Sequence, residues 1–243
     1  YERTPLNPRI ERADDSSPYW RKQKVVYAAA YGNEEITAYV FLPKNATPPY
    51  QTVVFFPTAY ARQVPSSDSL DLGTFEFLIR SGRAVIYPVY QGTFERRRNV
   101  QTGPSGIRDM LMQQAKDVFR TVDYLETRPD IDMQRLAYYS LSMGAYFGPI
   151  PVSLEPRFKV AVFAAGGLRY TNFHTTALCS PMLTETSRPT VCAVPFTSSP
   201  SMSPASTPRH SSPRELADLV GKLLAERDSF RDGRESEAAP LQV

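Results

Sequence analysis

The sequence contains few of the residues that build metal centres or disulfide frameworks. It has two cysteines, Cys179 and Cys192, and two histidines, His174 and His210, in 243 residues. The cysteines match neither a zinc-ligand spacing nor a disulfide framework. We therefore expect no metal and no other cofactor.

Long apolar runs and a strong charge of one sign are also missing. No stretch reaches the length that crosses a bilayer, so we expect no membrane segment in this chain. The net charge is +3 and the basic residues are scattered, which argues against a nucleic-acid partner. The one basic cluster, Arg96-Arg97-Arg98, is expected to be a solvated loop.

The chain begins neither with Met nor with a signal peptide, since its first residues are Tyr-Glu-Arg-Thr-Pro. We expect it to be part of a longer polypeptide, and nothing in it identifies a cellular compartment.

What the sequence does contain is a set of short apolar runs separated by helical patterns. The runs 52–56, 84–87, 136–139 and 159–164 are almost continuously apolar, which is typical of strands covered on both faces. Apolar residues recur at helical spacing over 72–79 and 107–127. Two further β-rich runs, 24–31 and 35–42, flank Gly32-Asn33 and predict an antiparallel hairpin. This alternation predicts an α/β fold, with a mostly parallel sheet and helices on both faces.

Composition divides the chain into five parts around one main domain. We predict an N-terminal arm over 1–22, an α/β core over 23–168, and a Ser/Thr/Pro-rich irregular segment over 169–213. An amphipathic helix over 214–230 follows, and 231–243 is a polar tail.

Ser142 lies where the apolar run 136–139 gives way to a helical pattern that starts at Met143. A nucleophile elbow has this strand–turn–helix order, with small residues two positions before and after the nucleophile. Ser140 and Gly144 meet that requirement. The elbow would direct the Met143 N–H toward a developing oxyanion. The alternative is an ordinary helix N-cap serine with no chemical role.

Seven phrases in the first part of the chain carry a family resemblance. They lie at 1–7, 14–18, 30–34, 41–45, 48–54, 78–85 and 124–132. Together they resemble α/β-hydrolases of the dienelactone hydrolase-like and acylaminoacyl-peptidase-like kind, especially the hydrolase module attached to some bacterial serine/threonine kinases. The resemblance covers about 1–168. It implies that Ser142 is a nucleophile and that the N–H groups of Met143 and Ala59 stabilise the oxyanion.

Beyond Leu168 the resemblance nearly stops, and chain order alone indicates the other site residues. Such hydrolases continue with an acid, a histidine and a final helix. No aspartate lies between Asp132 and Asp218, so Glu185 is the expected acid and His210, just before the predicted last helix, the expected base. The alternative is that His210 is a surface residue of a polar loop and that the C-terminal strands are missing.

Two functions follow. The first is a serine hydrolase that acts on a small-molecule ester or amide. The lack of an aspartate in the acid interval and the Ser/Thr/Pro-rich segment would impair its activity. The second is a non-catalytic regulatory or binding module, a decayed hydrolase joined to a kinase or another domain.

Overall fold

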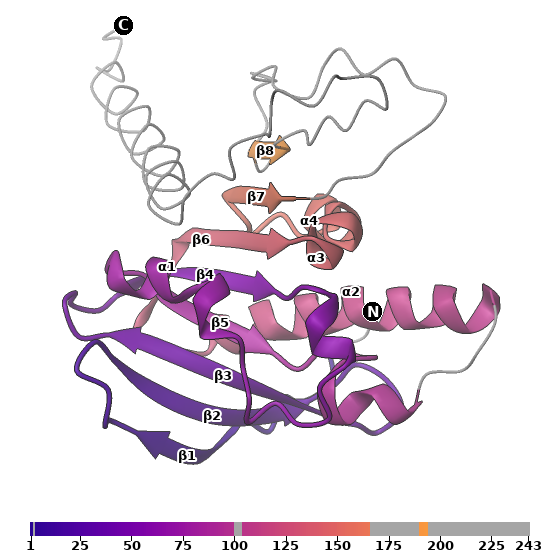
Figure 1. Cartoon of the computed structure of the whole chain (residues 1–243), viewed down its shortest axis with the longest axis horizontal. Coiled ribbons are helices and arrows are strands. Elements are labelled where there is room, and N and C mark those ends of the chain that lie inside the picture. Colours follow the sequence, from indigo (N-terminus) through magenta and orange to yellow (C-terminus); the bar gives the residue numbers. More distant parts are fainter. Residues whose placement is uncertain (2, 100–103, 166–189, 194–243) are drawn as a thin grey trace, which may run out of the picture. The chain divides into compact units, whose positions relative to one another are not determined.

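The computed structural model describes residues 1, 3–99, 104–165 and 190–193. The strands of these residues form one sheet in the order β1-β2-β3-β5-β4-β6-β7-β8 (Figure 1). Because strands that neighbour each other along the sheet are not always consecutive in sequence, helices must cross over between them.

The first strands of the sheet are antiparallel. They are β1 (Arg9–Asp14), β2 (Trp20–Ala28) and β3 (Glu35–Pro43). Gly32 and Asn33 adopt φ angles of 62° and 52° between β2 and β3, as tight hairpin turns require. The predicted hairpin is confirmed. Strand β1 lies within the predicted arm over 1–22, and its exposed, polar sequence gives no strand pattern.

Four of the other strands run parallel to one another. They are β4 (Tyr50–Phe56), β5 (Ala84–Pro88), β6 (Ile131–Leu141) and β7 (Val160–Ala164), and β5 pairs antiparallel with β3. Each carries a run of buried residues, which matches the four apolar runs of the sequence. The predicted α/β fold with a mostly parallel core is confirmed.

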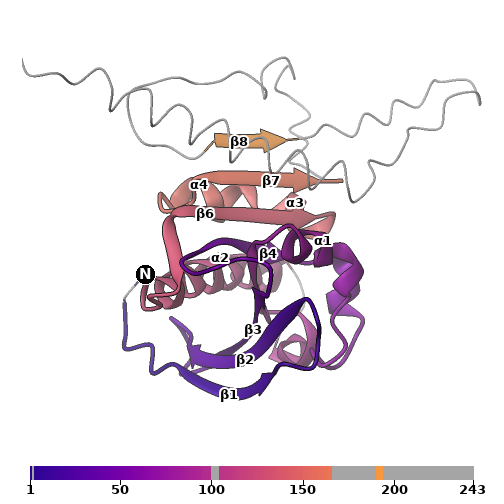
Figure 2. The same ribbon diagram turned by 90° about the vertical axis from the view of Figure 1, so that its left-hand side faces the viewer.

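Helices cover both faces of the sheet (Figures 1 and 2). The long helix α2 (Pro104–Glu126) packs on one face, where Tyr124 stacks on Tyr27 at 4.9 Å between ring centroids. Phe75 packs on the opposite face against Phe41 and Tyr87. Within the described residues, no helix is both long and apolar enough to cross a membrane.

The helix predicted over 72–79 is divided in two. Phe75 adopts φ −145° and ψ −6°, and this residue separates η2 (Leu72–Thr74) from α1 (Glu76–Arg80). The break lets the Phe75 ring reach the sheet, where it is fully buried. The other short helices are η1 (Ala59–Arg62), η3 (Phe94–Asn99), α3 (Met143–Phe147) and α4 (Pro149–Leu154).

Arg96 is buried, so the expectation of a solvated loop is wrong for this residue. Its guanidinium donates to Asp117 and to the Val89 carbonyl, each at 2.8 Å. Asp117 is fully buried on α2 and also accepts hydrogen bonds from the Tyr31 hydroxyl at 2.7 Å and the Gln91 N–H at 2.8 Å. The basic run concealed this role because its counter-ion is distant in sequence.

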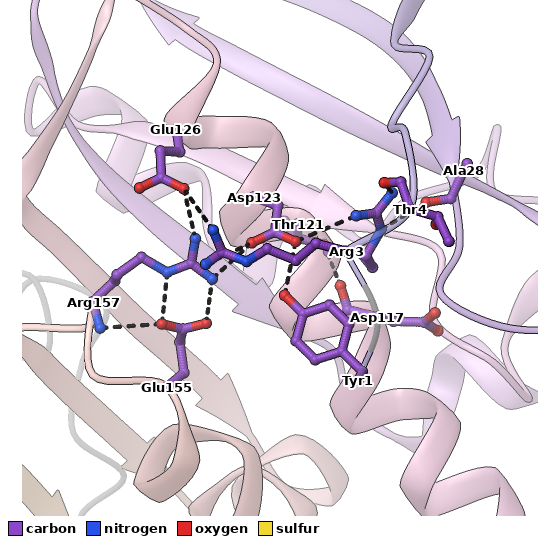
Figure 3. A network of polar contacts seen from close by, with 11 residues as sticks. Tyr1, Arg3, Thr4, Ala28, Asp117, Thr121, Asp123, Glu126, Glu155 and Arg157 are labelled. Atoms are coloured by element: carbon purple, nitrogen blue, oxygen red, sulfur yellow. Dashed lines mark hydrogen bonds and ion pairs between the residues drawn. The ribbon is translucent and has the colours of Figure 1, made fainter.

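A second polar network ties the N-terminus to the C-terminal end of α2 (Figure 3). Asp123 accepts a hydrogen bond from the Tyr1 hydroxyl at 2.7 Å and pairs with Arg157 at 2.9 Å and Arg120 at 3.3 Å. Arg157 also pairs with Glu155, which follows α4, at 2.6 Å. Burial and the neighbouring Asp123 raise the pKa of Tyr1 to about 12, so its hydroxyl remains a donor at neutral pH.

Four residues of the predicted irregular segment form a strand. Strand β8 (Thr190–Ala193) pairs with β7 in parallel, which the Ser/Thr/Pro-rich composition of 169–213 does not predict. The predicted helix over 214–230 and the tail over 231–243 lie outside the described residues.

Candidate active site

Ser142 is the single residue between a buried strand and a helix. Strand β6 ends at Leu141 and α3 begins at Met143. Ser142 itself has φ 54° and ψ −107°, and its side chain is exposed. A serine at positive φ costs on the order of 1–3 kcal/mol, and such strain is found preferentially at functional sites. An ordinary N-cap residue has extended backbone instead.

Backbone hydrogen bonds hold Ser142 in this conformation. Its N–H donates to the Ala164 carbonyl at the end of β7 at 2.9 Å, and its carbonyl accepts from the Tyr146 N–H at 3.0 Å. The Ser142 hydroxyl makes no hydrogen bond within the described part of the chain. Neighbouring strands and α3 therefore fix the backbone of the turn.

The small residues on either side of Ser142 are required by close packing. A Cβ atom on Gly144 would lie 2.6 Å from the Phe56 carbonyl oxygen and 2.8 Å from the Phe56 ring. Ser140, two residues before Ser142, is fully buried. These contacts explain the small residues that the sequence places around Ser142.

Gly144→Ala is expected to lower the free energy of unfolding by about 1–3 kcal/mol, because a Cβ there displaces the backbone of β4. Urea unfolding would measure the change. Gly73→Ala is the matched control, since its Cβ would come no closer than 3.4 Å to a side-chain oxygen of Asp71. A Gly144→Ala protein as stable as the Gly73→Ala protein would contradict this packing.

The loop after β4 lies beside the elbow. Strand β4 pairs with β6, and the Gly144 N–H donates to the Pro57 carbonyl at 3.2 Å. Thr58 caps η1, and Ala59 is the first residue of that helix. Among the described residues, no acceptor takes the N–H of Met143 or of Ala59. These two donors thus come from adjoining segments at the same edge of the sheet.

The loop after β5 packs against the last residues of β4. The Tyr90 ring stacks on Phe56 at 4.0 Å, and the Tyr90 hydroxyl donates to the Phe55 carbonyl at 3.0 Å. Burial raises the pKa of Tyr90 well above its usual value, which keeps the hydroxyl protonated. The loop at 90–94 therefore packs directly behind the strand that leads to Ala59.

Three residues with positive φ lie beyond the carboxyl ends of the parallel strands. They are Phe94 at 46°, Ser142 at 54° and Ala165 at 52°. Ligands of open α/β sheets bind at the carboxyl ends of the strands. The position of these residues agrees with a site at Ser142.

Gly148, which follows α3, is a packing requirement that sequence reasoning missed. A Cβ on Gly148 would lie 2.5 Å from the hydroxyl of Tyr138, which is fully buried on β6. The pairing of a glycine with a buried tyrosine ten residues earlier has no signature in the sequence.

The predicted acid and base, Glu185 and His210, lie outside the described residues, as does His174. Of the five predicted site residues, the structure describes Ser142, Met143 and Ala59. Within the described ranges, no group of His, Cys, Asp and Glu side chains could hold a metal ion.

The chain aligns with solved structures of esterases over about two thirds of its length. An acetyl xylan esterase from Paenibacillus sp. R4 aligns with 67% of the chain at a TM-score of 0.52 and 21% identity. Acetyl xylan esterase 1 from Thermoanaerobacterium sp. JW/SL YS485 also aligns with 67% of the chain, at a TM-score of 0.52 and 14% identity. The chain has the α/β-hydrolase fold.

The alignments cover only part of each esterase, and the sequence identities are low. The chain spans about half the length of the two esterases, 55% of the first and 54% of the second. No family model and no curated protein matches the sequence. At these identities the likeness establishes the fold alone.

Proposed function

We propose that the chain is a serine hydrolase that acts on an ester or a small amide. The observation that carries the proposal is the backbone of Ser142, an exposed serine held at positive φ between a parallel strand and a helix. The names of the structural neighbours, which are esterases, favour an ester as the substrate.

The first chemical step is attack of the Ser142 oxygen on the substrate carbonyl carbon. His210 takes the hydroxyl proton, and Glu185 holds the imidazole in the required tautomer. The N–H groups of Met143 and Ala59 donate to the oxyanion of the tetrahedral intermediate. The intermediate then expels the alcohol or amine, which receives the proton from His210. Water hydrolyses the resulting acyl-enzyme by the same route.

The second candidate is a non-catalytic module of a larger protein, such as a kinase. It is favoured by the lack of any aspartate between Asp132 and Asp218 and by the change of composition after Leu168. Such a module would keep the elbow without a base beside it.

The two histidines provide a matched test. His210→Ala should lower kcat/KM for p-nitrophenyl acetate by at least about 100-fold, because general-base catalysis contributes that much. His174→Ala should leave kcat/KM unchanged. If both variants hydrolyse the ester at the wild-type rate, His210 is not the base. If the wild-type protein has no measurable turnover, the non-catalytic module becomes the better explanation.

A further inference from the structure

A cleft lies at the antiparallel end of the sheet, away from Ser142. Residues of β1, β2 and β3 form its floor, on the side of the sheet opposite α2. The loop that leads into η2 forms a wall. The cleft has a volume of about 230 Å³ beside Trp20 and about 450 Å³ beside Lys24. Three charged residues, Asp14, Lys22 and Asp68, line both parts.

Lys22 lines both parts of the cleft. Its ammonium lies 4.8 Å from the centroid of the Tyr39 ring and 6.0 Å from that of Phe41. No carboxylate of the described residues pairs directly with Lys22, whereas the neighbouring Lys24 pairs with Glu11 at 3.3 Å. Burial lowers the pKa of Lys22, as do the neighbouring Arg12 and Lys24, and Asp14 and Asp68 partly oppose this shift. Lys22 therefore presents N–H donors to whatever occupies the cleft.

The two carboxylates beside Lys22 are held in place by other groups. Asp68 accepts hydrogen bonds from the Tyr39 hydroxyl at 3.3 Å and the Ser66 hydroxyl at 3.2 Å. Asp14 accepts from the Ser16 N–H at 3.0 Å. Since each carboxylate has about four lone-pair positions, both retain acceptor capacity toward the cleft.

An aromatic wall completes the cleft. Trp20, the single tryptophan of the chain, packs edge-on against Phe41 at 6.3 Å. Its ring is partly exposed and lines the smaller part of the cleft. Binding sites for small molecules combine apolar and aromatic walls with a few fixed polar groups, and the cleft has both.

We infer that this cleft binds a neutral polyhydroxylated ligand, a sugar residue. Glu11, Arg12 and Lys24 also line the larger part, so the cleft carries three acidic and three basic side chains in all. An anion placed on Lys22 would lie beside Asp14 and Asp68, and a cation placed on either carboxylate would lie beside Lys22. A zwitterion could satisfy both signs, but it would lose the hydration of two charges on binding. A sugar hydroxyl both donates and accepts without that cost, and the apolar face of a sugar ring can lie against Trp20. The inference concerns a different site from Ser142 and does not depend on the proposed activity.

Trp20 fluorescence reports directly on this cleft, because no other tryptophan contributes. We expect a saturable change on titration with at least one of xylotriose, cellotriose and maltotriose, with a Kd in the millimolar range. Lys22→Met and Asp68→Asn should each weaken binding by about tenfold or more, since each removes a hydrogen-bonding charge. Lys116→Met, on α2 and outside the cleft, is the matched control and should bind as wild type does.

Inorganic phosphate and glycine test the excluded ligand classes in the same assay. A saturable response to phosphate or glycine with none to the trisaccharides would overturn the inference, as would no response to any trisaccharide at millimolar concentration. Equal binding by wild type, Lys22→Met and Asp68→Asn would also overturn it. Circular dichroism of each variant ensures that a loss of binding is not a loss of fold.

Discussion

Ser142→Ala should lower kcat/KM for p-nitrophenyl acetate by at least about 1,000-fold, because the oxyanion donors and substrate binding alone retain only a small part of serine-hydrolase catalysis. The hydroxyl of Ser142 is exposed and makes no hydrogen bond within the described residues, so its removal should leave the free energy of unfolding nearly unchanged. A large loss of rate without a loss of stability identifies a reacting group.

Ser153→Ala is a suitable control for that experiment. Ser153 is exposed on α4, close in sequence to the elbow, and its hydroxyl donates only to the Ile150 carbonyl at 2.8 Å. It should retain the wild-type rate. A Ser142→Ala protein that hydrolyses the ester as fast as the Ser153→Ala protein would exclude Ser142 as the nucleophile.

The largest effect on stability is expected at Asp117. Its carboxylate is fully buried and accepts hydrogen bonds from Arg96, Tyr31 and the Gln91 N–H at 2.7–2.8 Å. Asp117→Ala leaves the buried Arg96 without this partner, and breaking a buried ion pair in this way costs about 3–5 kcal/mol. Urea unfolding followed by Trp20 fluorescence would measure the loss.

Two further variants separate the ion pair from other effects at Asp117. Asp109→Ala, on the same helix, removes a half-exposed carboxylate that pairs with its neighbour Arg108 at 3.0 Å, and an exposed pair contributes at most about 1 kcal/mol. The double variant Arg96→Met with Asp117→Leu removes both charges and should recover much of the lost stability. If Asp117→Ala is no less stable than Asp109→Ala, the buried pair does not hold this face together.

The parallel core could be predicted from the sequence because its strands are buried on both faces. In β4, β5 and β7 the apolar run and the strand nearly coincide. β1 could not be predicted, since its side chains face solvent and only its pairing with β2 makes it a strand. The burial of Arg96 could not be predicted either, because its partner Asp117 is 21 residues away.

A short sequence pattern likewise predicts part of the candidate site, and the rest depends on residues that are distant in sequence. The turn at Ser142 follows from small residues within two positions of it, so a short sequence pattern predicts it. The contact of Gly144 with Phe56 depends on the pairing of β4 with β6. The roles of Glu185 and His210 depend on long-range placement that chain order alone does not supply, and they remain predictions.

Covalent labelling of Ser142 tests the central claim most directly. A fluorophosphonate probe reacts when an activated serine oxygen displaces fluoride from phosphorus, so it reports the nucleophile without requiring a particular substrate. Mass spectrometry of the digested protein should locate a single adduct on the peptide that contains Ser142, and Ser142→Ala should carry none. An adduct that persists in Ser142→Ala, or a wild-type protein that remains unlabelled under conditions that label a known serine hydrolase, would contradict the account.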